Sequence, residues 1–561
     1  MTQPMPASDT RLPIDRWVDE LARMSVAERH AAIEAYRFPA NIGSLIREAA
    51  AQTPDTTALS FFEAGRTLTY AELDRMVDRV ALALAAQGVA FGDKVGVMLP
   101  NIPEFPLCWL ALMRIGAVMV PVNLRYTGRE LAYVLDDSQA RFLVIHDTCA
   151  EQLRAARAGA AGSFPADERI VLVGAAAGGA LARFEDIVAA TAEGGRYEGV
   201  EPGHDTLANI QYTSGTTGFP KGCMLTHRYW LGAGLVNAVR DGKRFHRVLA
   251  ATPFFYMDPQ WLLILAAYHR GTLFVAARQS ASRFAGWLRE HRINFCLFPE
   301  IVMKQPEAPG ERLTELRRAN IYGVRKQAHA RLRERFNAPA MEAFGMTEVG
   351  PCLYMPLDAT DMIGSGSCGI PAPFRQVRIV DETGADVPAG EIGELVVRGP
   401  GIMQGYYRRE DANRDSFFGE WFRTGDLFRR DERGYHYIVG RLKDMVRRAG
   451  ENIAAREVEA VLRNMDEVEE AAVVPVPDPM RGEEVKAYIQ PRDPAEAGDA
   501  LIGRILAHCA GNLAAFKVPR YLEFVSEIPR TASQKMAKSK LVEGRADLRQ
   551  GSFDRVEGRW I

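Results

Sequence analysis

The chain has 561 residues, of which 47% are apolar and 25% charged, and its formal net charge is −2. This length exceeds what a single hydrophobic core supports, so we expect at least two domains, with the composition of an ordinary globular protein. The near-neutral charge provides no electrostatic argument for nucleic acid or an anionic membrane as the main partner.

The cysteines and the apolar stretches favour a cytoplasmic protein. The seven cysteines include no Cys-x-x-Cys pair and no metal-ligand spacing, which indicates reduced thiols and argues against a zinc site. The start of the chain lacks the apolar core of a signal peptide. The best candidate for a membrane span, residues 107–122, contains Arg114 and is shorter than the roughly 20 residues that a span needs. We therefore predict a buried helix that leads into a strand, and no membrane span.

The first half of the chain is expected to form an α/β domain. Ser25-Val-Ala-Glu28 fits a capping box and predicts a helix to about Arg37, so residues 1–40 form an N-terminal helical extension. From Asn41 to about Ile210, helical stretches alternate with short apolar runs such as 94–99 and 141–146. This alternation predicts βα units and a largely parallel sheet.

Residues 212–227 read Tyr-Thr-Ser-Gly-Thr-Thr-Gly-Phe-Pro-Lys-Gly-Cys-Met-Leu-Thr-His. Glycines let backbone N–H groups approach an anion, and hydroxyls and a lysine add donors, so the stretch is typical of a polyphosphate cradle. It is not a Walker A loop, because Phe219 and Pro220 separate Gly218 from Lys221 and Gly222 follows the lysine. By itself the segment could also be a flexible linker.

The stretch from Tyr212 to Gly222 resembles the phosphate loop of the adenylate-forming superfamily, which comprises acyl-CoA synthetases, peptide-synthetase adenylation domains and luciferases. The resemblance covers about residues 41–545. It implies that Thr216 also contributes to a Mg²⁺ site. The residues that it assigns to ATP in this loop are Thr213, Ser214, Gly215, Thr216, Thr217, Gly218 and Lys221.

The family places an aromatic gate where this chain reads Pro253-Phe-Phe-Tyr-Met-Asp-Pro-Gln-Trp261. The resemblance assigns Tyr256, Asp258 and Trp261 to the acyl pocket; the alternative is that most of these aromatic residues are core. A carboxylate buried without a partner is costly, so Asp258 is a candidate for binding a cationic group beside aromatic faces. This segment and residues 514–523 are most similar to the carnitine/crotonobetaine–CoA ligase branch, which makes a betaine-type acid one hypothesis.

Phe344-Gly-Met-Thr-Glu348 is a second motif, which in isolation could simply begin a helix. The resemblance implies that Phe344 stacks on adenine, that Thr347 bonds near the α-phosphate and that Glu348 binds Mg²⁺, for which a carboxylate is a suitable hard ligand. Many relatives have a Gly-Gly-Ala-Pro turn before this motif, and the turn lines the adenine and acyl pockets. This chain has Tyr322-Gly-Val-Arg325 there, so this side of the pockets stays unassigned.

A Gly-x-Gly-x-x-Gly match at residues 364–369 is accidental, because Pro371 and Pro373 block the helix that a dinucleotide fold requires. Strand patterns then dominate residues 377–438, where the family has a small β-barrel-like subdomain. After Asp444 the pattern changes to a small α/β unit. The elements expected there are a helix near 456–464 and strands near 471–476, 485–490 and 521–525.

Two further motifs follow in the order of the family: Trp421-Phe-Arg-Thr-Gly-Asp426 and Gly440-Arg-Leu-Lys-Asp444. Asp426 matches the acceptor of the ribose hydroxyls, a role suited to a carboxylate. Arg441 matches a ribose and phosphate contact, Lys443 the domain hinge, and Gly450 a glycine beside the CoA channel. Without the resemblance, the charges would be taken for ordinary surface residues and Gly450 for a turn glycine.

The segment Pro529-Arg-Thr-Ala-Ser-Gln-Lys-Met-Ala-Lys538 resembles the one that delivers the catalytic lysine, here Lys535. A positioned cation would bring together the attacking carboxylate and the α-phosphate, which are both anionic. Gln534 stands where the family usually has glycine. The resemblance therefore assigns the identity of the catalytic lysine more firmly than the shape of the loop that brings it to the substrate.

The resemblance implies an α/β fold in three parts: the extension 1–40; an AMP-binding domain 41–442, made of α/β subdomains and the β-barrel-like subdomain; and a mobile α+β C-terminal domain 443–561. The implied activity is an acid–CoA ligase that uses ATP, Mg²⁺ and coenzyme A and forms an acyl-AMP. Loading of a carrier protein and a non-catalytic acyl or nucleotide binder remain alternatives. The acid is not determined, and neither is the oligomeric state, for which a homodimer stays open.

Overall fold

The computed structural model describes residues 12–159, 164–175, 181–213, 220–323, 326–449, 451–531 and 536–561. They form two compact units. Unit 1 is drawn from Met1–Thr213, Pro220–Gln376 and Arg398–Asp415, and unit 2 from Val377–Val397 and Ser416–Ile561. Each unit has its own sheets and hydrophobic core.

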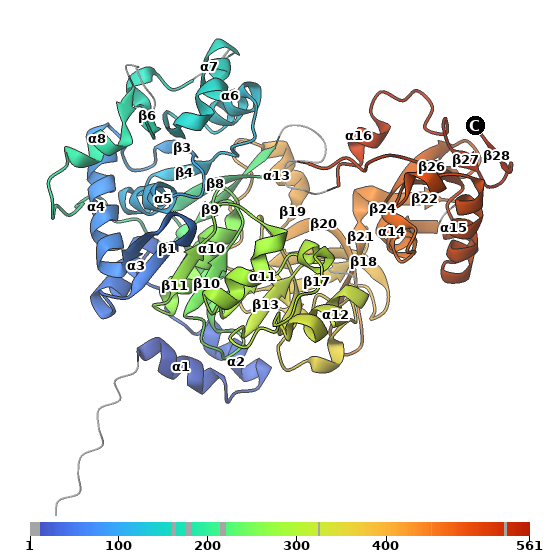
Figure 1. Ribbon diagram of the computed structural model, residues 1–561, viewed down its shortest axis with the longest axis horizontal. Coiled ribbons are helices and arrows are strands. Elements are labelled where there is room, and N and C mark those ends of the chain that lie inside the picture. The colour runs from blue at the N-terminus through green and yellow to red at the C-terminus, as the bar shows by residue number, and fades with distance from the viewer. Residues whose placement is uncertain are drawn as a thin grey trace, which may run out of the picture. The chain divides into compact units, whose positions relative to one another are not determined.

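Two sheets form the frame of unit 1 (Figure 1). Among the described residues, one has nine strands, in the order β16 (Ile370–Pro371), β15 (Gly350–Tyr354), β14 (Ala340–Met346), β13 (Arg318–Ile321), β12 (Phe295–Leu297), β10 (Arg247–Ala250), β11 (Thr272–Val275), β1 (Thr57–Phe61) and β2 (Arg66–Thr69). The other has seven, in the order β7 (Ala182–Arg183), β6 (Ile170–Val173), β5 (Phe142–His146), β3 (Lys94–Met98), β4 (Val118–Pro121), β8 (Leu207–Thr213) and β9 (Lys221–Thr226). Most neighbouring strands are parallel, and the antiparallel pairs lie at the sheet ends, so the parallel α/β prediction is confirmed.

Helices fill the space between these sheets and cover their outer faces. The inner helices are α3 (Ile42–Gln52), α4 (Tyr70–Ala86), α5 (Glu104–Ile115), α9 (His227–Val239) and α10 (Met257–Tyr268). Of these, α10 packs on β10 and β11, whereas α5 packs on β4 and α9 on β9. The outer helices are α6 (Gly128–Asp137) and α7 (Ala150–Gly159) on the seven-stranded sheet, and α11 (Ala281–Glu290) and α12 (Lys326–Phe336) on the other. α8 (Phe184–Ala189) and α13 (Glu410–Ser416) complete the set.

The expected N-terminal extension is present as α1 (Pro13–Leu21) and α2 (Val26–Glu34). Ser25 and Glu28 form the predicted capping box at the start of α2. The extension packs on unit 1: Arg29 Nη1 donates to the Arg240 carbonyl at 3.0 Å, and a ring nitrogen of His30 lies 2.7 Å from the Tyr354 hydroxyl. It therefore covers the C-terminal end of α9 and the adjoining part of β15.

The apolar stretch 107–122 forms most of α5 and all of β4, as predicted. Every residue of α5 after Glu104 is buried. No helix among the described residues is long and apolar enough to cross a bilayer. The Gly-x-Gly-x-x-Gly match precedes the short strand β16 and not a helix, which confirms that it is accidental.

Unit 2 has two sheets of its own. The first, where the resemblance implies a barrel-like subdomain, is a five-stranded sheet of β17 (Gln376–Val380), β18 (Ile392–Arg398), β19 (Phe417–Phe418), β20 (Trp421–Arg430) and β21 (His436–Arg441). The second comprises β22 (Met445–Arg448), β23 (Glu451–Ala454), β24 (Val468–Asp478), β25 (Gly482–Pro491), β26 (Tyr521–Phe524), β27 (Phe553–Asp554) and β28 (Arg559–Trp560). Its helices are α14 (Ala455–Arg463), α15 (Asp499–Asn512) and α16 (Ser539–Val542).

Alternating side chains of β24 build the two faces of this second sheet. Val473 belongs to the larger cluster with α14 and α15, whereas Ala472 and Val474 belong to a smaller one with Leu541 of α16. Successive residues of a strand point to opposite faces, which accounts for the two clusters. α16 is thereby attached to the face opposite α14 and α15.

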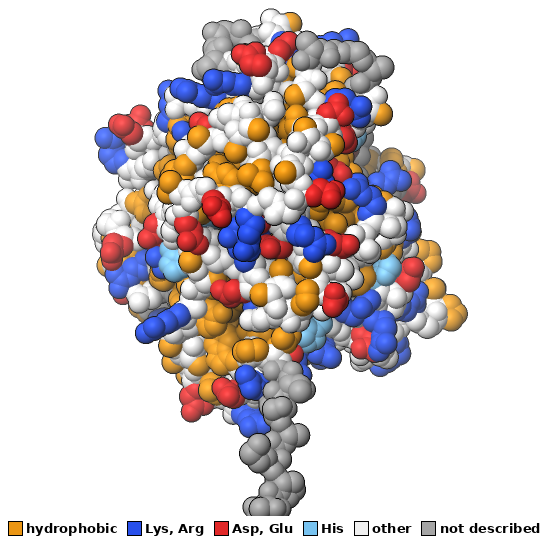
Figure 2. Space-filling view, turned by 90° about the vertical axis from the view of Figure 1, so that its left-hand side faces the viewer, with side chains coloured by type: hydrophobic (Ala, Val, Ile, Leu, Met, Phe, Trp, Pro, Cys, Tyr) orange, Lys and Arg blue, Asp and Glu red, His pale blue; other side chains and the backbone are white. Residues whose placement is uncertain are grey.

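Charged residues of both signs are interspersed on the molecular face drawn in Figure 2. This distribution agrees with a net charge of −2 and with the ordinary composition of the chain.

Candidate active site

The two ends of the phosphate loop are held by an antiparallel strand pair. Thr213 ends β8 and lies opposite Lys221, which begins β9, and Thr213 Oγ1 is 3.4 Å from the Lys221 carbonyl. The pairing brings these two predicted ATP ligands together at the base of the loop. Ser214, Gly215, Thr216, Thr217 and Gly218 lie outside the described residues.

Tyr406 contacts the lysine at the end of this loop. Lys221 Nζ lies 4.0 Å from the centre of the Tyr406 ring, within the range of a cation–π contact. The backbone of Tyr406 also bridges that of Cys223 in β9. The sequence motifs did not single out Tyr406, because 185 residues separate it from Lys221 and only the fold brings the two together.

The Phe-Gly-Met-Thr-Glu motif forms the tip of a β-hairpin. Phe344 is on β14, and Thr347 and Glu348 lie in the turn before β15. Gly350, with φ of +68°, adopts a backbone conformation that favours glycine and completes the turn. The alternative that this motif begins a helix is therefore wrong.

Glu348 is a buried carboxylate, only 7% exposed. The Tyr406 hydroxyl donates to its Oε1 at 2.9 Å, and the Met403 N–H donates to its main-chain carbonyl at 2.8 Å. A buried carboxylate is tolerated when it accepts hydrogen bonds. Tyr406 thus links the loop lysine and the predicted Mg²⁺ ligand.

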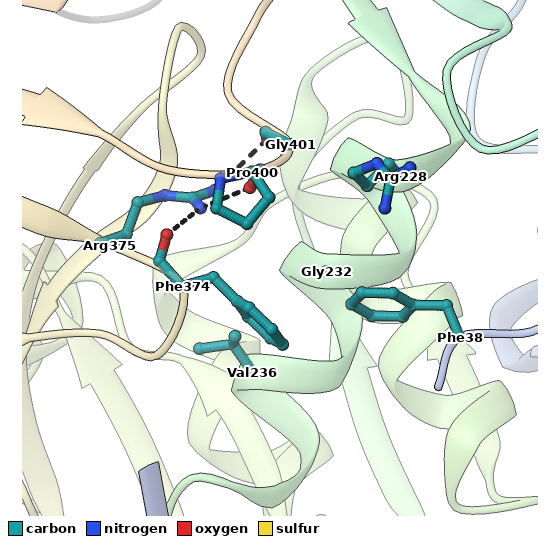
Figure 3. A pocket seen from close by; sticks show the side chains of 8 residues that line it. All are labelled: Phe38, Arg228, Gly232, Val236, Phe374, Arg375, Pro400 and Gly401. Carbon is teal, nitrogen blue, oxygen red and sulfur yellow. Dashed lines mark hydrogen bonds between the residues drawn. The ribbon is translucent and has the colours of Figure 1, made fainter. Parts of the chain in front are cut away.

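Arg375 supports the same turn from behind. Its Nε donates to the Val349 carbonyl at 2.8 Å, and its Nη1 donates to the carbonyls of Phe374 and Pro400 at 3.0 and 2.9 Å. Figure 3 shows the guanidinium directed at the backbone of Phe374, Pro400 and Gly401, beside a small pocket between Phe374 and α9. Burial lowers the pKa of Arg375. Its hydrogen bonds to carbonyls connect the residue after Glu348 with the loop that leads to Tyr406.

The turn also touches the segment predicted to bind the acyl group. The Thr347 hydroxyl is 3.6 Å from the sulfur of Met257, the first residue of α10. Asp258 follows Met257, and its Oδ1 accepts a hydrogen bond from Trp261 Nε1 at 3.2 Å. The carboxylate predicted to be costly in an aromatic stretch therefore has an indole partner.

The aromatic residues of this segment differ in their burial. Phe254, Phe255 and Trp261 are buried, and Trp261 packs edge-on against Phe295. Tyr256 is half-buried; burial raises its pKa, and Asn123 Nδ2 lies 3.5 Å from its hydroxyl. Core packing thus accounts for most of the buried rings, whereas Tyr256 and Asp258 retain partial exposure.

The predicted ribose ligand lies in unit 2. Asp426 is in β20, opposite Arg441 of β21, and its Oδ1 is 3.0 Å from Arg441 Nε. The Asp426 side chain is 3% exposed, whereas that of Arg441 is 42% exposed. The fold therefore brings together the two residues that the sequence assigned to the ribose region, as an ion pair with one accessible partner.

Local backbone irregularity directs Asp426. Gly425 has φ of +69°, and the β18–β20 register shifts between Glu394 and Val396. The Gly425 N–H donates to Glu394 Oε1 at 3.0 Å. Bulges of this kind re-aim side chains near functional sites, which gives the glycine before Asp426 a physical role.

Of the remaining predicted residues, the structure describes Lys443. Lys443 is part of the 3₁₀ turn Leu442–Asp444, which follows β21. Gly450, Lys535 and Gln534 lie outside the described residues, as do Val324 and Arg325 of the unassigned pocket wall. Their proposed roles rest on the resemblance.

The donor set at the turn suits Mg²⁺. Glu348 supplies a hard carboxylate oxygen, and its Oε1 is oriented by Tyr406. Mg²⁺ is usually held by one or two protein carboxylates together with substrate phosphates and water. Among the described residues no group of three His, Cys, Asp or Glu side chains forms a protein-only metal site.

Comparisons with known proteins show the family of the chain. The family model of the AMP-binding enzymes matches residues 46–407, and that of their C-terminal domain matches residues 457–535. A sulfoacetate–CoA ligase of Cupriavidus necator is 33% identical over 510 residues, which are 89% of this chain and 97% of that protein. A crotonobetaine/carnitine–CoA ligase of Salmonella paratyphi A is 33% identical over 505 residues, 87% of this chain and 96% of that protein.

A solved structure has the same fold. The o-succinylbenzoate–CoA synthetase of Bacillus subtilis, in complex with its acyl-adenylate intermediate, superposes with a TM-score of 0.78 at 25% identity. The match covers 91% of this chain and 100% of that one. The chain belongs to the AMP-binding enzyme family, within the adenylate-forming superfamily.

Proposed function

We propose that this chain is an ATP-dependent carboxylic acid–CoA ligase. The observation that carries the proposal is the position of the Thr347–Glu348 turn. Through Tyr406 the turn is linked to Lys221 at the end of the phosphate loop, and through Met257 it contacts the start of the acyl segment. In this proposal the acid binds beside the turn, next to the α-phosphate of ATP.

In the first half-reaction an oxygen of the substrate carboxylate attacks the α-phosphorus. The new P–O bond forms as the bond to pyrophosphate breaks, so the products are acyl-AMP and pyrophosphate. Thr347 bonds near the α-phosphate, the phosphate loop with Lys221 holds the departing pyrophosphate, and Lys535 supplies a positioned cation. Phe344 stacks on adenine, and Asp426 and Arg441 bind the ribose.

Mg²⁺ neutralises phosphate charge when it is bound, and Glu348 and Thr216 would hold it. Support comes from the buried Glu348 carboxylate, whose orientation is set before ATP arrives. Tyr406 performs this orientation and also supports Lys221 through its ring.

In the second half-reaction the sulfur of coenzyme A attacks the acyl carbonyl carbon, the bond to AMP breaks, and the thiol proton leaves with the departing phosphate or solvent. We place the boundary of the mobile C-terminal domain at Lys443, so that residues 41–442 form the AMP-binding domain and 443–561 the domain that pivots, with 1–40 as the extension. Gly450 would lie beside the channel for coenzyme A. Such pivoting shields the first half-reaction from water, as lid motions do.

We infer the class of acid from Asp258. The two relatives described above are named for acids of opposite side-group charge, sulfoacetate and a betaine, and both are 33% identical, so the identity alone does not choose between them. A partly exposed carboxylate beside Tyr256 and Trp261 favours a cationic group on the substrate. We therefore propose a betaine-type acid, as in carnitine metabolism. A cytoplasmic location fits the seven free cysteines.

The test is a panel of acids of similar size that carry a cationic, neutral or anionic group. Formation of AMP that depends on ATP, Mg²⁺ and coenzyme A establishes the ligase activity. If no acid in the panel supports AMP formation, the proposal is contradicted. For the substrate class, Asp258→Asn is compared with wild type. We expect the preference for cationic over neutral acids to fall about 10-fold, the value of one charge interaction of about 1.4 kcal/mol. An unchanged ranking rejects the role of Asp258.

A further inference from the structure

The two ends of the segment that carries Lys535 are joined in unit 2. The backbones of Arg530 and Met536 form an antiparallel bridge, and the Ala537 N–H donates to the Pro529 carbonyl at 2.8 Å. Arg530 Nη2 also lies 2.8 Å from Glu470 Oε2. This joined pair is the base of the segment, and Met536 directly follows Lys535 in the chain.

Lys538 lies on the C-terminal side of this base, three residues after Lys535. Its Nζ is 2.6 Å from Glu459 Oε1 and 3.6 Å from Asp444 Oδ2. The Lys538 side chain is 18% exposed and that of Glu459 is 6% exposed. The ammonium group is therefore engaged within unit 2 by two carboxylates from different elements.

The two partners of Lys538 lie on different elements of the unit. Glu459 is on α14, and its Oε1 accepts a second hydrogen bond from the Val473 N–H of β24 at 2.8 Å. Asp444 is the last residue of the 3₁₀ turn that contains Lys443. Lys538 thus connects the base of the Lys535 segment to a helix of the core and to the residue after the proposed hinge.

A purely stabilising ion pair would be a simpler explanation for this contact. However, an apolar pair of similar volume commonly stabilises a fold as well as a buried ion pair does, so the pair is weak evidence for stability alone. The ion pair also fixes where the Lys538 ammonium group lies. The Val473 N–H orients the Glu459 carboxylate, and Lys538 lies near Asp444 at the same time. Such a contact sets the position of the chain to which it belongs.

We propose that Lys538 is a positioning residue for adenylation, which acts through Lys535 by holding the base of its segment against Glu459 and Asp444. This inference rests on the proposed function, in which Lys535 serves the first half-reaction only. Lys538 itself does not touch the substrate. It follows that loss of Lys538 should impair the formation of acyl-AMP and spare its conversion to the thioester.

The experiment measures the two half-reactions separately in the full-length enzyme. Acid-dependent exchange of pyrophosphate into ATP reports the first, and thioester formation from supplied acyl-AMP and coenzyme A reports the second. Lys538→Met should lower the exchange rate about 100-fold, the effect of a displacement of about 1 Å at a reacting centre. The thioester rate should stay within about 3-fold, since a folded unit 2 still binds coenzyme A.

Three further variants separate positioning from other effects. Lys538→Arg keeps a cation that can bridge Glu459 and should restore most of the exchange. Glu459→Gln keeps an acceptor for Val473 and weakens the ion pair, so it should lower exchange by less than Lys538→Met. Lys540→Met removes the same charge from an exposed position two residues away and should change neither rate.

The decisive comparison is with Lys535→Ala. If Lys538 acts only through Lys535, the double variant Lys535→Ala/Lys538→Met should be no slower in exchange than Lys535→Ala alone. A further additive loss overturns the inference, and so does an equal fall of both half-reactions in Lys538→Met. An active wild type that tolerates Lys538→Met also rejects it, whereas a wild type without exchange for any acid rejects the proposed function itself.

Discussion

In unit 1 the carboxylates of Glu348 and Asp258 accept hydrogen bonds from uncharged donors, the Tyr406 hydroxyl and the Trp261 indole. In unit 2 the carboxylates of Asp426 and Glu459 lie against the cations of Arg441 and Lys538. Neutral donors set an orientation without neutralising the charge, which suits the Mg²⁺ role proposed for Glu348. Ion pairs neutralise the charge until a substrate competes for one of the partners.

The difference matches what each unit must do. Unit 1 presents a preset turn between phosphate loop and acyl segment, and buried neutral hydrogen bonds are little affected by salt. Arg441 is half exposed, so its pair with Asp426 is open to screening and to exchange with ribose and phosphate groups. In the function we propose, the carboxylates of unit 1 have their orientation set by neutral donors, whereas Arg441 of unit 2 provides an accessible charge for the nucleotide.

The largest expected effect comes from removing the positive charge of Lys535 in unit 2. Lys535→Ala should lower adenylation by about 1,000-fold, because one preorganised donor at the reacting phosphate is removed. Thioester formation from supplied acyl-AMP should be retained. Separate assays of pyrophosphate exchange and thioester formation check this, and equal loss of both would reject the role of Lys535.

A smaller effect is expected for the ribose carboxylate. Asp426→Asn keeps the size of the side chain but removes a charged acceptor for two hydroxyls, which should reduce kcat/KM for ATP by about 100-fold. Steady-state kinetics at low and high salt measure it, and the wild-type KM for ATP should itself rise with salt. Asp411→Asn, at a side chain that is 92% exposed on α13, is the control that should leave kcat/KM unchanged.

The smallest effect is expected for the hydrogen bond from the Tyr406 hydroxyl to Glu348 in unit 1. Tyr406→Phe keeps the ring under Lys221 and removes the donor to Glu348, so kcat for adenylation should fall about 10-fold, with about 1.4 kcal/mol lost. The loss should not depend on salt. Tyr407→Phe is the matched control, because the Tyr407 hydroxyl bonds the exposed Gln139 at 2.7 Å. If the two variants lower kcat equally, or if the loss of kcat in Tyr406→Phe depends strongly on salt, the proposed contrast between the units is wrong.

Local patterns accounted for much of the fold. The capping box at Ser25 and Glu28 begins α2, and the apolar runs at 94–99 and 141–146 became the parallel strands β3 and β5. These features depend on neighbours in the chain, so the sequence displays them directly. The hairpin at Thr347 and Glu348 was ambiguous, because its turn depends on the pairing of β14 with β15.

The candidate site divides in the same way. The sequence by itself determined the family and the identities of Glu348, Asp426 and Arg441, because ordered motifs specify chemistry through residue type and spacing. Only the tertiary structure decided which side chains they contact: Tyr406 for Glu348, and each other for Asp426 and Arg441; it also paired Lys538 with Glu459. For Tyr406 and Lys538 the partner is distant in the chain or on another element, so the contact exists only after the sheets and helices have packed.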